Sequence, residues 1–284
     1  MVELRMLGVL MLLAAGTVVS GCDDAKKAPA AAVSAPAASS TSAEDSPPPP
    51  PPPPDSAGPP PLPVVNEMVR IPGGTFTMGY KGGQKDEQPH QVTVAPFEMD
   101  VWEVTLRAYM ACIDANACTY PDYDTFCVWG KKDRLDHPMN CIDWDQAAAY
   151  CSYVGKRLPT EEEWEFAARG TDGRIYPWGN DPKPPEGICF NRGKLGTCRV
   201  ADVPVDSPFG LRGMAGNVWE WTASGYNETY SAKRETDRMV YRGGSFYEQE
   251  VSSLRATLRD RRTRPNRLDI LGFRCARSPG AKKT

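Results

Sequence analysis

The sequence is poor in the residues and patterns that several common classes of protein require. It contains only two histidines, His90 and His137, in 284 residues. It has no Cys-x-x-Cys pair, which disfavours a structural zinc site. It also has no run of about 20 apolar residues, the length that a transmembrane helix needs. Its formal net charge of -3 argues against a general affinity for nucleic acid.

The N-terminus does contain a shorter apolar run, from Met6 to Val19, which follows Arg5. This length and the small residues at its end are typical of a signal peptide. The exit Val-Ser-Gly-Cys resembles a bacterial lipobox, so residues 1–22 are interpreted as a lipoprotein signal peptide with lipidation at Cys22. A plain secretory signal cut at the same place is the alternative. Either one predicts export, and the lipid would anchor the protein to a membrane of the cell envelope, facing the periplasm or the cell exterior.

Residues 23–64 are rich in alanine, serine and proline and cannot build a core. Eight consecutive prolines run from Pro47 to Pro54. Because proline fixes φ and donates no backbone hydrogen bond, this run predicts a stiff polyproline II spacer that holds a domain away from the membrane. A docking site for a proline-binding partner is the alternative.

Residues 65–278 have the length and apolar content of one globular domain, and residues 279–284 form a short tail. Thr105, Asp143 and Thr160 are candidate N-caps, and Thr160 forms a capping-box pattern with Glu163. Helices are therefore expected at 106–115, 144–154 and 161–169. Strands are expected at 68–71, 75–78, 91–94, 239–242, 254–259 and 272–276. Long segments rich in Gly, Pro, Asn and Asp lie between them, so the domain is expected to be α+β and loop-rich.

Eight cysteines remain after Cys22, and an even number in an exported chain predicts disulfide bonds. Connectivity does not follow from the sequence alone. We propose that neighbours pair and that one long link joins a helix to the final strand: Cys112–Cys118, Cys189–Cys198, Cys127–Cys141 and Cys151–Cys275. In the chain-entropy model the long link constrains the unfolded chain by roughly several kcal/mol.

Six motifs then occur in a specific order along the domain. They are Ile-Pro-Gly-Gly-Thr-Phe-Thr-Met-Gly from Ile71, Gly-Lys-Arg-Leu-Pro-Thr-Glu-Glu-Glu-Trp-Glu-Phe from Gly155, Tyr-Pro-Trp-Gly from Tyr176, Met-Ala-Gly-Asn-Val-Trp-Glu-Trp-Thr from Met214, Tyr-Arg-Gly-Gly-Ser-Phe from Tyr241, and Leu-Gly-Phe-Arg-Cys-Ala from Leu271. Their order resembles that of the formylglycine-generating (sulfatase-modifying factor) family over nearly the whole domain. The resemblance implies a disulfide-stapled, C-type-lectin-like fold, and Cys151 and Cys275 match a disulfide of family members.

The resemblance also implies an activity, the oxygen-dependent oxidation of a protein cysteine to formylglycine. Oxidase members bind Cu(I) through two cysteines shortly after the Gly-Gly-Ser motif, and the matching positions here are Glu248 and Ser253. Cu(I) requires soft thiolates, whereas a carboxylate and a hydroxyl are hard ligands. We therefore expect neither copper nor oxidase activity. The alternative is a formylglycine-generating oxidase or another modifying enzyme with non-standard ligands, for example if Cys127 and Cys141 stay reduced.

Two other metals are implied by the resemblance. A branch of this fold binds non-haem iron through histidines, but His90 lies in an early loop and His137 in a His-Pro turn, so we expect both to be structural or solvent-facing. The family also binds Ca²⁺, which prefers oxygen ligands. Carried over, Gly216 and Val218 would offer carbonyls and Glu220 a carboxylate. Gly213 stands where many members supply an Asn or Asp, and the alternative is that this segment packs the core without metal.

The surface that binds an extended peptide in oxidase members is matched by Ser245, Trp219 and Phe246, which should line or flank a groove. An intact scaffold without copper ligands favours binding of an unknown envelope protein or glycan, or a role in envelope assembly, over catalysis. Six arginines between Arg255 and Arg267 are interpreted as a solvated loop, with local anion binding as the alternative.

Overall fold

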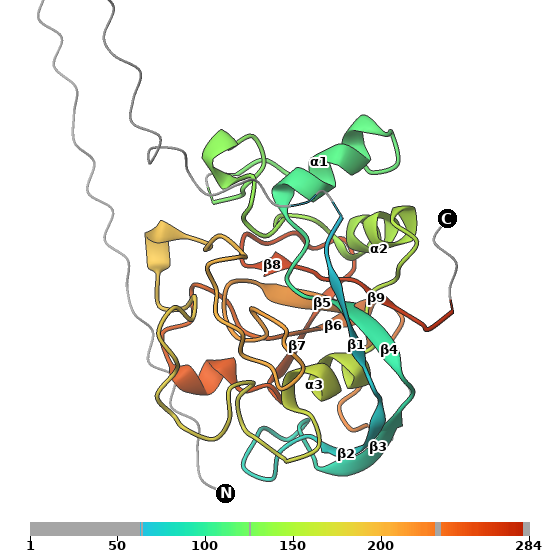
Figure 1. The fold of residues 1–284 in the computed structure, drawn as a ribbon, viewed down its shortest axis with the longest axis vertical. Helices are drawn as coiled ribbons and strands as arrows, with labels where there is room; N and C mark the ends of the chain where they lie inside the picture. The colour runs from blue at the N-terminus through green and yellow to red at the C-terminus, as the bar shows by residue number, and fades with distance from the viewer. Residues whose placement is uncertain (1–62, 64, 125, 231–233, 281–284) are drawn as a thin grey trace, which may run out of the picture. The chain divides into compact units, whose positions relative to one another are not determined.

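Short strands and short helices joined by long loops form the domain (Figure 1). The computed structural model describes residues 63, 65–124, 126–230 and 234–280. Its helices are α1 (Leu106–Asp114), α2 (Trp144–Tyr153) and α3 (Glu161–Arg169). Its strands are β1 (Met68–Ile71), β2 (Gly74–Met78), β3 (His90–Val94), β4 (Phe97–Asp100), β5 (Trp219–Gly225), β6 (Arg238–Arg242), β7 (Arg259–Thr263), β8 (Leu271–Gly272) and β9 (Ala276–Arg277). The α+β, loop-rich class predicted from the sequence is confirmed.

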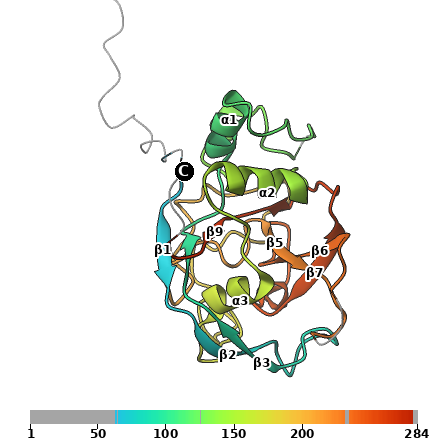
Figure 2. The same cartoon turned by 90° about the vertical axis from the view of Figure 1, so that its right-hand side faces the viewer.

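The strands form three sheets. Their orders are β1-β4-β9, β2-β3 and β7-β6-β5-β8. All neighbours are antiparallel except β5 and β8, which are parallel. Figures 1 and 2 show α1 and α2 together at one end of the unit, the β2–β3 hairpin at the other, and α3 between that hairpin and the four-stranded sheet.

The helices begin where the sequence predicts. The side chains of Thr105, Asp143 and Thr160 each accept a hydrogen bond from a backbone N–H of the following first turn. Asp143 and Thr160 belong to complete capping boxes, with Gln146 and Glu163 as partners. Polar caps thus set the helix starts, and packing of the apolar faces stabilises these short helices.

Two tryptophans mark the two main parts of the core. Trp221 of β5 is fully buried in a cluster with α1 and α2, and Trp164 of α3 is fully buried in a cluster with β2 and β4. Trp164 and Trp221 both occur in the motifs of the sequence. The four-stranded sheet therefore packs against α2 and against α3.

A buried ionic cluster links α3 to β6 and β7. Glu161 of α3 lies 2.7 Å from guanidinium nitrogens of Arg242 and of Arg259, and all three side chains are 0% exposed. Burial raises the pKa of Glu161, but the positive charges of Arg242 and Arg259 more than offset this and hold it below its usual value. This cluster fixes the end of β6, after which the Gly-Gly-Ser motif begins.

The four disulfides are those proposed from the sequence. They are Cys112–Cys118, Cys127–Cys141, Cys151–Cys275 and Cys189–Cys198. The alternative in which Cys127 and Cys141 stay reduced is therefore not what the structure shows. Lipidation at Cys22 and the linker lie outside the described residues. Among the helices of the described residues, none is long and apolar enough to cross a membrane.

Two predicted strands are wrong. Residues 254–259 do not form a strand: the segment starts at the end of the 3₁₀ turn Val251–Leu254, and β7 begins only at Arg259. Its buried Ala256 donates its backbone N–H to Ile175 O, a loop carbonyl, rather than to a neighbouring strand. The predicted strand at 272–276 is split into β8 and β9, because its middle crosses from one sheet to another and pairs with the chain around β4.

Candidate functional site

The Gly-Gly-Ser motif makes a tight turn directly after β6. Gly243 and Gly244 have φ of +106° and +75°, a region that favours glycine. A Cβ on Gly244 would lie 2.8 Å from Leu254 Cδ2 and 2.9 Å from Ser253 O. The turn therefore requires glycine here, and the close approach holds the segment around Ser253 against the motif.

The two positions that match the copper cysteines lie beside this turn. Glu248 Cγ is 3.7 Å, and Ser253 O is 2.9 Å, from the place where a Cβ on Gly244 would be. Glu248 Oε1 accepts hydrogen bonds from the Trp219 indole N–H at 3.0 Å and from the Ser245 hydroxyl at 3.3 Å. The structure thus brings the two positions together, but it uses the carboxylate to hold neighbouring side chains.

The predicted groove residues lie beneath the surface. Ser245 is 0%, Phe246 is 1% and Trp219 is 6% exposed. Phe246 packs in a small cluster with Cys189 and Val203. These three side chains support the surface from within, and the groove itself stays a prediction.

Sequence reasoning missed the parts of this surface that solvent reaches. Tyr247 is 60% exposed and directly follows Phe246. The backbone N–H groups of Asn191 and Arg192 donate to the carbonyls of Glu248 and Phe246, both at 2.8 Å. The loop closed by Cys189–Cys198 is therefore part of the same surface, which no local sequence pattern indicates.

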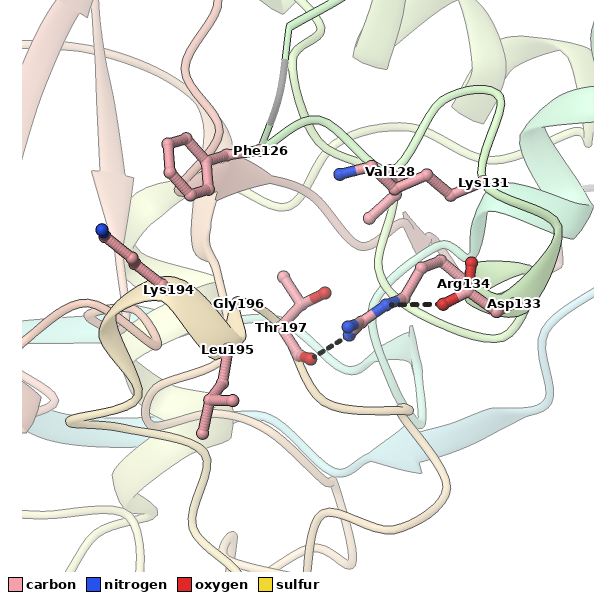
Figure 3. Close-up of a pocket in the computed structure, with 9 residues that line it drawn as sticks. All are labelled: Phe126, Val128, Lys131, Asp133, Arg134, Lys194, Leu195, Gly196 and Thr197. Atoms are coloured by element: carbon pink, nitrogen blue, oxygen red, sulfur yellow. Dashed lines mark hydrogen bonds and ion pairs between the residues drawn. The ribbon is translucent and has the colours of Figure 1, made fainter.

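The same loop also lines a pocket of about 290 Å³, together with residues 126–134 (Figure 3). We call it the loop pocket. Arg134 Nη1 donates to Thr197 O at 3.1 Å and joins the two walls. His137 Nδ1 lies 2.9 Å from the Thr197 hydroxyl. Burial and the charge of Arg134 lower the pKa of His137 to about 4, so this histidine is neutral at pH 7.

The structure gives the two histidines separate partners. His90 stacks on Tyr230 at 4.0 Å between ring centroids and contacts Gln88 O, whereas His137 contacts Thr197. Within the described part of the chain, no group of three or more His, Cys, Asp or Glu residues is arranged to hold a metal ion.

The carboxylate expected to bind calcium is occupied by other partners. Arg274 Nη2 lies 2.7 Å from Glu220 Oε1, and the Trp164 indole donates to Glu220 Oε2 at 2.7 Å. All three side chains are fully buried. Glu220 therefore balances a buried guanidinium in this structure.

Glu103 was not among the residues predicted from the sequence. Unlike that of Glu220, its buried carboxylate is not bound by an arginine or a tryptophan of the described residues. It is 0% exposed, and neither of its carboxylate oxygens makes a hydrogen bond of good geometry within the described residues, although the Asn217 side chain lies close enough to lower its pKa. Both oxygens lie 2.9 Å from where a Cβ on Gly213 would be. Burial raises the pKa of Glu103 to about 8, against the opposing positive charge of Arg274 and with a smaller contribution from the negative charge of Glu220. Its carboxylate thus fills the place of the side chain that Gly213 lacks.

The predicted solvated loop of arginines is wrong for several of its members. Arg259 lies in β7 and is 3% exposed, and Arg255 pairs with the buried Glu87 at 2.9 Å. Arg267 pairs with Asp143 at 2.7 Å. These side chains form ion pairs with carboxylates of the domain. The spacing of arginines in the sequence cannot reveal such pairs.

Known proteins resemble this chain in sequence and in fold. The family described as Sulfatase-modifying factor enzyme 1-like domain matches residues 55–279. "Inactive C-alpha-formylglycine-generating enzyme 2" of Bos taurus is 32% identical, over 75% of this chain and 88% of that protein. "Formylglycine-generating enzyme" of Mus musculus is 30% identical, over 75% of this chain and 75% of that protein.

Among solved structures, PvdO from Pseudomonas aeruginosa is similar with a TM-score of 0.63 and 27% identity, over 76% of this chain and 95% of that one. This likeness confirms the predicted C-type-lectin-like arrangement with few regular elements.

Proposed function

Because this chain belongs to the sulfatase-modifying factor enzyme 1-like family, we propose that it is a non-catalytic member that binds a protein or glycan at the cell envelope. The proposal rests on the identity of the residues beside Gly244. The two positions that match the copper cysteines hold Glu248 and Ser253. The family scaffold around them is retained.

Copper does not fit the residues that are present. Cu(I) prefers thiolates, and Glu248 and Ser253 supply only oxygen. The eight cysteines of the described residues are all bound in disulfides, so none of them can replace the lost ligands. The Glu248 carboxylate is moreover engaged by Trp219 and Ser245.

The relatives do not decide between the two functions by themselves. One relative is named a formylglycine-generating enzyme and another an inactive one, and both are similar to this chain. The absent thiolates favour the inactive group. A scaffold that keeps its fold without its metal ligands remains suited to binding, since the surface loops carry recognition.

Location at the envelope rests on the N-terminal sequence. A lipid on Cys22 would anchor the chain in a membrane, and residues 23–64 would act as the spacer between the anchor and the domain. The partner would then be a protein or glycan within reach of that spacer.

The oxidase alternative can be tested directly. The purified domain, residues 65–284, is incubated with Cu(I), oxygen and a peptide that contains the cysteine substrate of this family. We expect no peptide aldehyde by mass spectrometry, because no free thiolate stands at the two positions that would hold Cu(I). Conversion of the peptide in proportion to the enzyme and to time would refute the proposed function.

We further propose that a calcium ion binds beside Glu103. A buried carboxylate without a hydrogen bond is costly unless it is protonated or meets a cation, and calcium is held by carboxylate and carbonyl oxygens. Glu103 would supply the carboxylate, and the resemblance to the family implies the backbone carbonyls of Gly216 and Val218 as further ligands. Bound calcium would neutralise Glu103 and tie it to the turn that begins at Gly213.

Calcium is expected to raise the melting temperature of the domain. At a free Ca²⁺ concentration of about 100 times the dissociation constant, binding stabilises the folded state by about 2.7 kcal/mol, which corresponds to a shift of roughly 5–10 °C. Glu103→Gln should abolish the shift, and Glu186→Gln, which changes an exposed carboxylate, should keep it. A melting temperature that is the same in calcium and in EDTA would mean that Glu103 is simply protonated and that no calcium binds.

A further inference from the structure

The loop pocket has apolar side chains on its walls that solvent reaches. Leu195 is 65% and Phe126 is 43% exposed, and they come from loops about 70 residues apart in the sequence. Single exposed apolar side chains are common on protein surfaces. Phe126 and Leu195 border one pocket from separate loops (Figure 3), and because the Leu195 side chain is directed away from Phe126, the Phe126 ring is the apolar face offered to a ligand.

The charged side chains of the pocket are mostly positive. Lys131, Arg134 and Lys194 line it together with one acid, Asp133. Arg134 is held by Thr197 O and lies 3.4 Å from Asp133. Lys194 is exposed and has no hydrogen bond or ion pair with the other described residues. Lys194 is therefore the cation that remains available to an incoming anion.

The pocket is held in shape by covalent bonds. Cys127 lies between two of its lining residues and is bonded to Cys141, while Cys198 follows Thr197 and is bonded to Cys189. Walls that are fixed before binding lose little conformational entropy on binding. The disulfides thus favour a pre-formed site.

The size of the pocket restricts its ligand. Its volume of about 290 Å³ is at the lower end of the range of roughly 300–1,000 Å³ that is usual for small-molecule sites. One compact group fits this space better than an extended peptide does. A bare phosphate would satisfy Lys194 but would leave the apolar face of Phe126 without a contact.

We infer that the loop pocket binds a sugar acid, that is, a sugar ring that bears a carboxylate; this rests on the proposed binding function and names its ligand class. The carboxylate pairs with the Lys194 ammonium in a charge-assisted contact. The C–H face of the ring packs on Phe126, because an aromatic ring offers a flat apolar surface with a specific geometry. The hydroxyl groups of the sugar point toward solvent and toward the polar side chains that line the pocket.

The test measures binding of digalacturonate to the disulfide-bonded domain by titration calorimetry and NMR. Digalactose, pentaglutamate and inorganic phosphate are the comparison ligands. We expect digalacturonate to bind, with amide shifts at residues 126–134 and 194–197, and the three comparison ligands to bind at least about tenfold more weakly. Equal binding of digalactose would overturn recognition of the carboxylate. Equal binding of pentaglutamate or phosphate would overturn recognition of the ring, and no binding of digalacturonate would overturn the inference as a whole.

Variants locate the site. Lys194→Gln should weaken digalacturonate binding by about tenfold, the loss of one charge-assisted contact, and Phe126→Ala should weaken it without changing its dependence on salt. Lys183→Gln removes an exposed lysine outside the pocket and should bind like wild type. If Lys194→Gln also binds like wild type, the pocket is not the site. Failure here leaves the non-oxidase function intact, because that function falls only if the same preparations oxidise a cysteine peptide.

Discussion

A variant that carries both Glu248→Cys and Ser253→Cys is expected to bind Cu(I) at least about 10³-fold more tightly than the wild-type domain, a difference of about 4 kcal/mol. Two thiolates would then stand at positions that already lie together beside Gly244. Soft Cu(I) binds thiolate far better than carboxylate or hydroxyl. The affinity is measured by competition with a chromogenic Cu(I) chelator in the presence of a mild reductant.

The matched control is a second pair of cysteines on the same loop. Gln249 and Ser252 are both exposed, and neither matches a copper position of the family. The variant Gln249→Cys/Ser252→Cys should therefore gain much less affinity. Each single variant should also fall short, since one thiolate cannot form a two-sulfur site. Equal affinity of the wild type and the double variant would show that copper is held elsewhere, and the account of the site would be wrong.

Replacing Arg274 by methionine is expected to lower the free energy of unfolding by about 3–5 kcal/mol. The Arg274 side chain is fully buried, and its guanidinium donates to both oxygens of Glu220, at 2.7 and 2.8 Å. It also donates to four backbone carbonyls, of residues 100, 101, 212 and 213. Its removal would leave Glu220 buried without a cation, next to the equally buried Glu103.

Chemical denaturation under non-reducing conditions measures this effect, with companion variants that separate charge from packing. Arg262→Met changes an exposed arginine and should alter stability by no more than about 0.5 kcal/mol. Arg274→Met with Glu220→Gln should recover part of the loss, because the uncompensated charge is gone. If Arg274→Met lowered the free energy of unfolding by less than about 1 kcal/mol, the buried Arg274–Glu220 ion pair would not be an important link between the motif that begins at Met214 and the one that begins at Leu271.

Local signals were sufficient for the helices and for the three disulfides between neighbouring cysteines, whereas Cys151–Cys275 spans 124 residues and was supported by the family resemblance. Thr105, Asp143 and Thr160 cap the three helices at the predicted residues, because a capping side chain acts within one turn of its own position. Pairing of neighbouring cysteines likewise identified the short links. These features depend on residues close together in the chain.

Strand β5 was missed because it is buried on both faces. β5 (Trp219–Gly225) has six buried residues of seven and lacks the alternation by which a half-buried strand is recognised. The segment at 254–259 shows the opposite error. Its Leu254 and Ala256 are buried and alternate with Arg255, yet its backbone pairs with a loop.

The site was predicted in part. Counting from the Gly-Gly-Ser motif identified Glu248 and Ser253, which the structure does place together. Glu103 was missed, because its neighbour Gly213 is about 110 residues away and nothing near Glu103 in the sequence signals an unpaired carboxylate. The loop pocket was missed for the same reason, since two distant loops form it.

The central claim is that the described residues of this domain offer no free cysteine thiolate to copper, and a thiol and metal count on the purified wild-type domain tests it most directly. The domain is denatured without reductant, its free thiols are titrated, and its copper is determined by mass spectrometry after exposure to Cu(I) and desalting. The account predicts no free thiol and no retained copper. Two free thiols together with one copper ion per chain would contradict it.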